Sequence, residues 1–340
     1  MAITKVTTGT IADDSIQSLK NRNLIINGAM QVAQRGTSFS AGGAVYTLDR
    51  WLVFRSAASQ STDVPTSEGL VNSIQLTITS QTSGQFASVE QKFENEKLVV
   101  GRQLTFSFWI KGSTTGTAVV RNFSQSNSIG FGHTAFDITT SWQRVTATFT
   151  VPSLGGGTSN WCSFGIDFNV NNVAGLSYSG SGVSEPSYTG TVYLTGVQLE
   201  VGSVATPFEH RSYGEELALC QRYYQRFNAS GNFSRYGNGY WSNSNDANAS
   251  ISFPVPMRAD PSIDDTGDVT DYGISNAGSV PTPTSLPTFY RGTQTSDGSC
   301  LVANLSLVST GNGTAGNVAQ FMSRGGGLAV GTFIGFDAEL

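Results

Sequence analysis

Carboxylates are the residues of this sequence with the clearest capacity for chemistry. Five aspartates fall within twelve positions, at Asp260, Asp264, Asp265, Asp268 and Asp271. Carboxylates crowded in a loop repel one another unless a cation binds, and Ca²⁺ accepts many oxygen ligands in irregular loops. The Asp-x-Asp-x-Asp spacing of a calcium loop is missing, however. We therefore expect a solvated polar loop and no cofactor, with Asp264, Asp265 and Asp268 as the only candidate metal ligands.

Other catalytic residues are sparse. The two histidines, His133 and His210, lie far apart and have no acidic neighbour in the sequence, so we expect structural or solvated roles for both. There is no nucleophile elbow, phosphate-binding loop or H-E-x-x-H motif. Glu90, Glu94 and Glu96 are interleaved with lysines, which predicts a solvated face. A carboxylate pair for glycoside cleavage could still come from two distant loops, but the sequence predicts a protein that is not an enzyme.

Outward-facing tryptophans are the first candidates for binding. In the segment QLTFSFWIKG the apolar residues alternate, which places Trp109 on the face opposite to theirs. The same count places Trp142 and Trp161 opposite the apolar residues of their own strands. Such an indole either packs against a neighbouring element or subunit, or offers a surface on which the C–H face of a sugar stacks. Both interpretations stay open.

A second aromatic group lies in the segment SRYGNGYWSNSNDANAS and comprises Tyr236, Tyr240 and Trp241. Tyrosine and tryptophan give a large contact area with few rotatable bonds, so ordering them on binding costs little entropy. Asn243 and its polar neighbours can bond the hydroxyls of a ligand. These four residues and Trp109 are the candidate ligand-binding residues. The alternative is that the aromatics fill the core of a small C-terminal domain.

The elements that must position these residues are mainly strands. Glycine is frequent, with 39 residues, and charged residues make up only 13% of the chain, a composition that favours short strands and turns. Apolar residues alternate with period two in the ranges 74–78, 104–110, 145–151 and 162–170. This pattern predicts an antiparallel jelly-roll sandwich over residues 24–208. Its last strand, from Tyr193 to Leu199, is expected to present one apolar face.

One helix is predicted, and it connects the sandwich to a second region. Ser212 and Glu215 have the spacing of a capping box at a helix start. Leu217, Cys220, Tyr224 and Phe227 follow at three- and four-residue intervals, so they would share one face of a helix over residues 209–227. This apolar stripe is the candidate oligomer interface.

A smaller β-domain is expected over residues 228–340, as the candidate receptor-binding tip. Ile251, Phe253 and Val255 alternate as in a strand, and Pro254 and Pro256 predict that this strand lies at a sheet edge. At the other end of the chain, residues 1–23 are polar and small. They are interpreted either as a frayed terminus or as an arm that orders only against a partner.

Charge and hydropathy exclude several classes of partner. The net charge is −5 with no basic cluster, which argues against nucleic acid. No apolar run approaches 18 residues, so no membrane insertion is expected. The N-terminus has no hydrophobic signal region. Three widely spaced cysteines indicate neither a disulfide framework nor a zinc site, and folding in a reducing cytosol is expected.

Several segments also carry a family resemblance. The segments NLIINGAMQVAQRGTSF, YTLDRW, FSFWIKG, SWQRVTATFTVP and TGVQLEVGSVATPFEHRSYGEELALCQRYYQRF resemble bacteriophage tail fibre and related virion appendage proteins. The middle of the chain is similar to the jelly roll of carbohydrate-binding modules. The resemblance implies a virion structural protein, made in the host bacterial cytoplasm, that forms a homotrimer. It also implies attachment to other virion proteins through the N-terminal arm and binding of a host cell-surface glycan or protein.

Two alternatives to a binding fibre stay open at this point. One is a purely architectural virion protein, such as a head fibre or collar component. The other is a capsule-degrading tail spike enzyme. The sequence lacks the solenoid repeats expected of such an enzyme and shows no recognisable acid pair, so host-surface binding without cleavage is the expected function.

Overall fold

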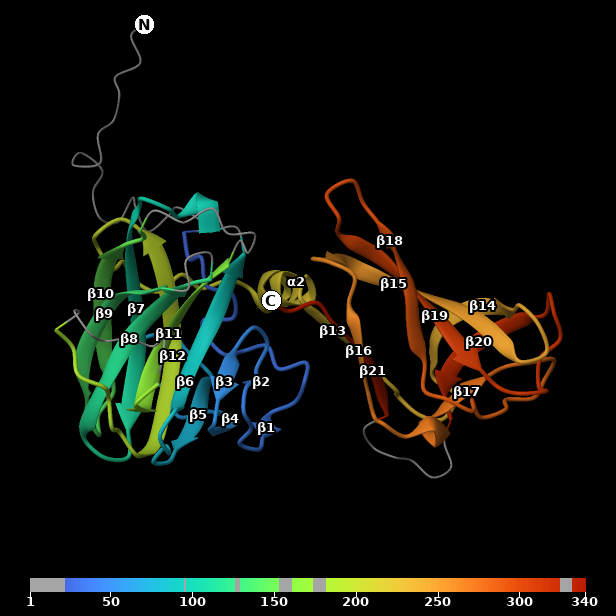
Figure 1. The fold of residues 1–340 in the computed structure, drawn as a ribbon, viewed down its shortest axis with the longest axis horizontal. Coiled ribbons are helices and arrows are strands. Elements are labelled where there is room, and N and C mark those ends of the chain that lie inside the picture. Colours follow the sequence, from blue (N-terminus) through green and yellow to red (C-terminus); the bar gives the residue numbers. More distant parts are fainter. Residues whose placement is uncertain (1–21, 95, 126–128, 153–160, 174–181, 325–331) are drawn as a thin grey trace, which may run out of the picture. The chain divides into compact units, whose positions relative to one another are not determined.

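Two compact units make up the chain in a computed structural model, which describes residues 22–94, 96–125, 129–152, 161–173, 182–324 and 332–340. The first unit holds the described residues up to Glu216 together with Leu340, and the second holds residues 217–339. Strands dominate both units (Figure 1), which confirms the prediction of a mainly β protein. None of the described helices is long and apolar enough to span a membrane.

The first unit is an antiparallel sandwich of two six-stranded sheets, as the alternating pattern predicts. Sheet A has the order β1 (Ser38–Phe39), β4 (Ala57–Ser61), β5 (Ser73–Ile78), β12 (Gly190–Val201), β7 (Gln103–Gly112), β10 (Gln143–Thr150). Sheet B has the order β2 (Val45–Tyr46), β3 (Leu52–Phe54), β6 (Gln85–Glu94), β11 (Trp161–Asn171), β8 (Gly116–Ser124), β9 (Ile129–Ile138). A short 3₁₀ helix, η2 (Glu96–Leu98), follows β6. The predicted jelly-roll class is thereby confirmed.

The core of this unit lies between the two sheets. Alternate residues of β7, Leu104, Phe106, Phe108 and Ile110, are all at most 1% exposed and belong to one cluster with the inward residues of β5 and β11. Full burial of an aromatic or aliphatic side chain contributes about 1.5–3 kcal/mol relative to exposure. The period-two pattern of the sequence therefore reports the inward face of these strands correctly.

Strand β12 departs from the predicted single apolar face. Its pairing with β7 shifts register between Thr195 and Gln198, where Gly196 has a φ of +59°. Leu194 belongs to the core before this shift and Val197 belongs to it afterwards, whereas Tyr193 does not. A bulge inserts one extra residue and therefore reverses which alternate residues point inward. The prediction that Tyr193 shares a face with Val197 and Leu199 was wrong for this reason.

The predicted helix begins as expected and ends early. Helix α2 spans Tyr213–Gln221. The Ser212 backbone N–H donates to a Glu215 carboxylate oxygen at 2.9 Å, and the Glu215 N–H donates to the Ser212 hydroxyl at 3.3 Å, which confirms the capping box. The chain then turns through a Tyr223 N–H···O=C Cys220 bond of 2.9 Å instead of continuing to residue 227.

Strand β13 (Tyr224–Asn228) replaces the last turns of the predicted helix. It pairs antiparallel with β21 (Phe333–Asp337). Tyr224 is fully buried there, and the Phe227 ring packs edge-on against Phe336 with centroids 6.0 Å apart. The strand gains ladder hydrogen bonds and aromatic burial that an isolated helix end does not offer. The predicted helical stripe therefore does not form.

The second unit contains two further sheets. Sheet C has the order β13, β21, β16 (Ser262–Asp265), and sheet D has the order β17 (Tyr272–Ile274), β20 (Val318–Ser323), β14 (Arg235–Trp241), β15 (Asp246–Met257), β19 (Cys300–Val308), β18 (Thr288–Gln294). A 3₁₀ turn, η3 (Val269–Asp271), precedes β17. The inward residues of both sheets form one core that includes Trp241, Phe321 and Phe336.

Strand β15 is central in sheet D, whereas its two prolines predicted an edge. Its ladder with β14 covers only residues 247–250, and its ladder with β19 shifts register between Ser252 and Met257. Pro254 and Pro256 lie beyond the first ladder and inside the second irregularity. A missing backbone N–H removes no regular ladder bond at such a position, so the prolines are compatible with a central strand.

The predicted N-terminal arm falls mostly outside the described residues, because only Arg22 and Asn23 of residues 1–23 are described. Both belong to the sandwich unit. Arg22 donates to the Pro207 carbonyl oxygen at 2.7 Å and pairs with Glu200 at 3.3 Å. The Asn23 side-chain amide donates to the Val197 carbonyl oxygen at 3.1 Å.

Candidate functional site

The outer face of sheet D carries two rows of side chains, all polar apart from Val318, that run across neighbouring strands. Strand register places the members of each row opposite one another. The first row is Gln320, Asn238, Ser250 and Asn304, beyond which the backbone of Arg291 pairs with Asn304. The second row is Val318, Tyr240, Asn248, Ser306 and Thr288. We call these nine residues the polar face. None of them is a member of the core cluster of the unit.

Amide and hydroxyl groups give the polar face its hydrogen-bonding capacity. The Ser250 hydroxyl donates to the Asn304 side-chain oxygen at 2.7 Å. The side-chain amides of Asn238, Asn248 and Gln320 make no hydrogen bond to other described residues. Each amide supplies two donors and one acceptor. Tyr240, which is 54% exposed, lies between these amides and adds an aromatic ring.

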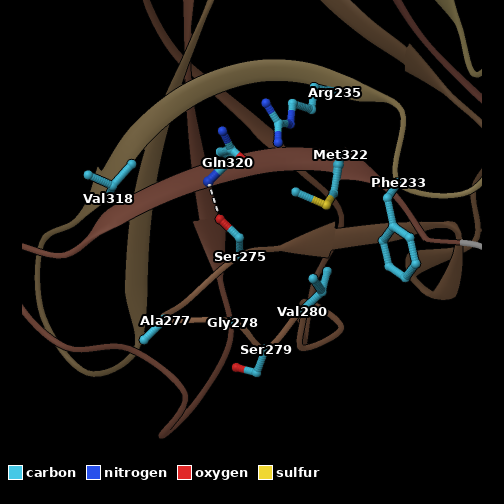
Figure 2. Close-up of a pocket in the computed structure, with 10 residues that line it drawn as sticks. All are labelled: Phe233, Arg235, Ser275, Ala277, Gly278, Ser279, Val280, Val318, Gln320 and Met322. Atoms are coloured by element: carbon cyan, nitrogen blue, oxygen red, sulfur yellow. Dashed lines mark hydrogen bonds between the residues drawn. The ribbon is translucent and has the colours of Figure 1, made fainter.

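A pocket of about 480 Å³ adjoins the polar face at strand β20, and we call it the edge pocket. Ten residues from β14, β20 and the adjoining turns line it: Phe233, Arg235, Ser275, Ala277, Gly278, Ser279, Val280, Val318, Gln320 and Met322. Val318 and Gln320 belong to both surfaces, which makes the two continuous. Figure 2 shows Arg235 and the turn at Ala277 and Gly278 on opposite sides of the β20 ribbon.

Phe233 is held in an unusual backbone conformation at this pocket. Its φ of +61° is in the left-handed region that a bulky residue rarely adopts, and its side chain is 52% exposed. The Ser234 hydroxyl accepts from the backbone N–H groups of Ser230 and Gly231 at 3.0 and 3.1 Å. The Phe233 N–H donates to the Ser323 carbonyl oxygen at 3.1 Å. These bonds fix the turn and present the ring to solvent, and backbone strain held in this way is common at ligand sites.

A tight hairpin turn forms another side of the edge pocket. Asn276 and Ser279 exchange two backbone hydrogen bonds of 2.9 Å, so Ala277 and Gly278 are the two central residues. Both have positive φ, +46° and +93°, as a type I′ turn requires. The preceding Ser275 is locked to β20, because its hydroxyl accepts the Gln320 N–H at 2.8 Å (Figure 2).

The structure separates the candidate residues predicted after the helix. Tyr240 lies on the polar face, whereas Trp241 is fully buried and its indole N–H donates to the Ser275 carbonyl oxygen at 2.9 Å. Trp241 therefore supports the floor of the edge pocket from inside the core and cannot contact a ligand. Tyr236 is partly buried, since its ring packs against Phe321 of the core with centroids 5.3 Å apart, and this burial raises the pKa of its hydroxyl.

Asn243 belongs to the turn between β14 and β15. Its side-chain oxygen accepts the N–H groups of Asn245 and Asp246 at 2.7 and 2.9 Å, and its amide donates to the Asp246 carboxylate at 2.8 Å. Asparagine side chains commonly satisfy turn N–H groups in this way. The contacts account for Asn243 as a turn residue, so of the four candidates in this segment the polar face contains Tyr240 alone.

The remaining ligand candidate, Trp109, is in the first unit. It lies on the outer face of sheet A as predicted and pairs in register with Thr195 and Arg144. A Cβ atom on Gly196 would lie 3.1 Å from both the Trp109 ring and Leu70. The indole is therefore closely packed beside Gly196 of the neighbouring strand β12, and its buried N–H has no hydrogen-bond acceptor among the described residues. Packing is the interpretation that these contacts favour.

The predicted interface residues are not exposed together. Cys220 and Tyr224 are fully buried, and Phe227 packs partly buried against the core of the second unit. The Tyr224 hydroxyl donates to Asp264 at 2.6 Å. Leu217 is half-buried. The stripe was therefore wrong as an interface, because its residues complete the interior of this chain.

The aspartate candidates for a metal are engaged separately. The Asp264 carboxylate accepts the Tyr224 hydroxyl, Asp265 accepts the Gly267 N–H at 2.8 Å, and Asp268 caps the 3₁₀ turn by accepting the Thr270 N–H at 2.9 Å. Across the part of the chain that the structure describes, no group of three or more potential metal ligands comes together.

One charged cluster was missed by sequence reasoning. Arg121 on β8 pairs with Glu90 on β6 and Asp167 on β11, each at 2.8 Å, and all three side chains are at most 6% exposed. Burial lowers the pKa of the Arg121 guanidinium. The two carboxylates raise this pKa by more than burial lowers it, so the net pKa lies above its usual value. The predicted solvated face was wrong for Glu90 and Glu96, which are both buried. The partners of Glu90, the Arg121 guanidinium and the Ser163 hydroxyl, lie 31 and 73 positions away, so no local pattern reveals them.

Comparison with known proteins finds similarity to solved structures. No protein-family model matches the chain, and no curated protein matches it. Among solved structures, the enzymatically active domain of bacteriophage CBA120 tailspike protein 4 is 15% identical, with 53% of this chain and 22% of that chain covered and a TM-score of 0.32. The chain therefore spans less than a quarter of that protein.

Two other solved structures have similar TM-scores and sequence identities to this chain. The xylan-binding domain CBM22-2 of Xyn10C from Paenibacillus barcinonensis is 15% identical over 46% of this chain and 94% of that chain, with a TM-score of 0.32. TmCBM61, solved in complex with β-1,4-galactotriose, is 12% identical over 54% of this chain and 100% of that chain, with a TM-score of 0.30. Scores at this level assign neither a family nor a function.

Proposed function

We propose that this chain is a structural protein of a bacteriophage appendage that binds saccharides of a host cell surface without cleaving them. The observation that carries the binding role is the polar face of sheet D together with the edge pocket. Sugars present hydroxyls around an apolar C–H face, and this surface offers amides beside exposed Tyr240, Phe233 and Val318. Apolar contact area with a few placed polar groups is what small-ligand sites share.

Binding without cleavage is part of the same proposal. Glycoside hydrolysis needs two carboxyl groups about 5–10 Å apart across the scissile bond. The ten residues lining the edge pocket include no Asp or Glu, and neither do the nine residues of the polar face. The described surface is therefore chemically suited to hold a saccharide and lacks the acid pair for breaking one.

The virion role is supported by the sequence segments that resemble tail fibre proteins. In this proposal the N-terminal arm attaches the protein to other virion components, three copies assemble, and the second unit meets the host surface. A trimer also protects exposed strand edges from unspecific pairing. Light scattering of the purified chain at micromolar concentration tests the assembly, and a stable monomer contradicts it.

A glycan array with the intact chain tests the binding role. We expect binding to a restricted set of oligosaccharides, and no increase in reducing ends after prolonged incubation. Tyr240→Ala is expected to weaken binding at least tenfold, because truncating an aromatic hot-spot residue commonly costs about 2 kcal/mol or more, and about 1.4 kcal/mol is tenfold.

Tyr213→Ala provides the matched control, since Tyr213 is 56% exposed and lies outside both surfaces. It should bind like the unaltered chain. Equal binding by the Tyr240→Ala and Tyr213→Ala variants, or no binding to any saccharide, would contradict the proposed site. Release of reducing ends would instead favour the tail spike enzyme.

A further inference from the structure

The edge pocket contains a single ionisable side chain. Of its ten lining residues only Arg235 is charged, and the others are apolar or neutral polar residues. Arg235 is exposed at the start of β14, and its side chain makes no ion pair or hydrogen bond to other described residues. Figure 2 shows Arg235 beside the neighbouring strand β20, which carries Gln320 and Met322. A cation is thus available at one wall of an otherwise uncharged pocket.

A guanidinium has a marked preference among ligand groups. Its planar array of five N–H donors matches the two oxygens of a carboxylate or the oxygens of a phosphate or sulfate. A sugar hydroxyl is neutral and gains much less from the same contact. The chain as a whole carries a net charge of −5, so a cation in this pocket acts against an overall charge that disfavours anions.

We infer that the edge pocket binds the anionic group of an acidic saccharide, an inference that rests on the saccharide-binding function proposed above. The Arg235 guanidinium receives the oxyanion, while Gln320 and the ring of Phe233 contact the neutral part of the same sugar. The pocket has no carboxylate that would compete for the guanidinium or repel the ligand. The class predicted is therefore a saccharide with a carboxylate, phosphate or sulfate substituent.

Matched ligand pairs test this inference. The intact chain is titrated with α-1,4-linked trigalacturonate and with its methyl ester, which has the same shape without charge. A second pair, mannotriose with and without a terminal 6-phosphate, distinguishes phosphate from carboxylate as the anion. We expect at least one acidic member to bind about tenfold more tightly than its neutral partner at 50 mM salt, and the preference to shrink at 500 mM salt because charges are screened.

Variants locate the effect. Arg235→Gln should abolish the preference and leave binding of the neutral member unchanged, and Arg235→Lys should retain part of it. Arg102→Gln makes the same charge change at an exposed position of the first unit and should change nothing.

The outcomes separate this inference from the proposed function. Equal binding of acidic and neutral members, or an undiminished preference in Arg235→Gln, overturns the inference alone if Tyr240→Ala still weakens saccharide binding. Absence of binding to every saccharide on the array and in these pairs overturns both.

Discussion

At the residue scale, Tyr240 and Trp241 are neighbours in sequence with opposite roles. Side chains alternate between the two faces of a strand, so Tyr240 is 54% exposed and Trp241 is fully buried. Trp241→Ala should lower the free energy of unfolding by about 3–5 kcal/mol, because it removes a large core side chain. Urea unfolding measures this loss.

Two comparison variants separate packing from hydrogen bonding at this position. Trp241→Phe keeps most of the apolar volume but leaves the Ser275 carbonyl oxygen without its indole donor, and should cost about 1–3 kcal/mol. Tyr240→Ala should change stability by less than about 0.5 kcal/mol, as for most surface substitutions. A Trp241→Ala variant as stable as the unaltered chain would contradict the core assignment.

Arg121 gives a second residue-scale prediction. Arg121→Met leaves two buried carboxylates without their positive partner, and breaking a buried ion pair typically costs about 3–5 kcal/mol. Adding Glu90→Gln and Asp167→Asn to the same chain should recover much of the loss, since the uncompensated charges are then gone. Urea unfolding of the single and triple variants checks both steps. A triple variant less stable than Arg121→Met would contradict this account.

His133 predicts how stability varies with pH. Burial lowers the pKa of His133, nearby Asp167 raises it and Arg121 lowers it, and the net pKa is below the usual 6.5. The unfolded chain therefore binds the proton more readily than the folded chain. The contribution of His133 to stability is fully present above about pH 6.5 and is lost as the pH falls through the folded value.

The expected outcome is measurable by comparing the unaltered chain with His133→Gln at pH 7.5 and pH 5. On going from pH 7.5 to pH 5, the unaltered chain should lose more unfolding free energy than His133→Gln, because glutamine does not titrate. A difference between the two chains that is the same at both pH values would show that this histidine is not the cause.

At the element scale, the hairpin turn at the edge pocket is suboptimal. Ala277 has a φ of +46°, where a Cβ atom costs roughly 1–2 kcal/mol. Asparagine tolerates this conformation and is favoured in type I′ turns. Ala277→Asn should therefore stabilise the second unit by about 0.5–1 kcal/mol. Ala315→Asn, at an exposed alanine without positive φ, is the control in thermal unfolding and should shift the midpoint little.

At the scale of the whole molecule, the two units have separate cores. Domains with their own cores can unfold independently. We expect denaturant unfolding in two steps, with Arg121→Met shifting one step and Trp241→Ala shifting the other. Near-ultraviolet circular dichroism and intrinsic fluorescence of each variant measure this. A single step that both variants shift equally would contradict it.

Local patterns were informative wherever one short segment determines its own environment. The alternation from Leu104 to Ile110 predicted a strand and its buried face, and the spacing of Ser212 and Glu215 predicted the helix start. In both cases the relevant contacts are within a few residues, or depend only on which side chains are apolar. The polar face was predicted only through Tyr240 and its neighbour Asn238, because its nine residues come from five strands whose order no local pattern reveals.

The sequence by itself determined the β class, the sandwich core and the start of the helix, because period and capping chemistry depend on neighbouring residues. Only the tertiary structure decided where the helix ends, since β13 forms by pairing with β21 more than a hundred positions away. It also decided that Trp241 is interior and Tyr240 exterior, because alternation does not say which face a second layer will cover. The buried Glu90–Arg121–Asp167 cluster and the edge pocket exist only once distant strands lie side by side.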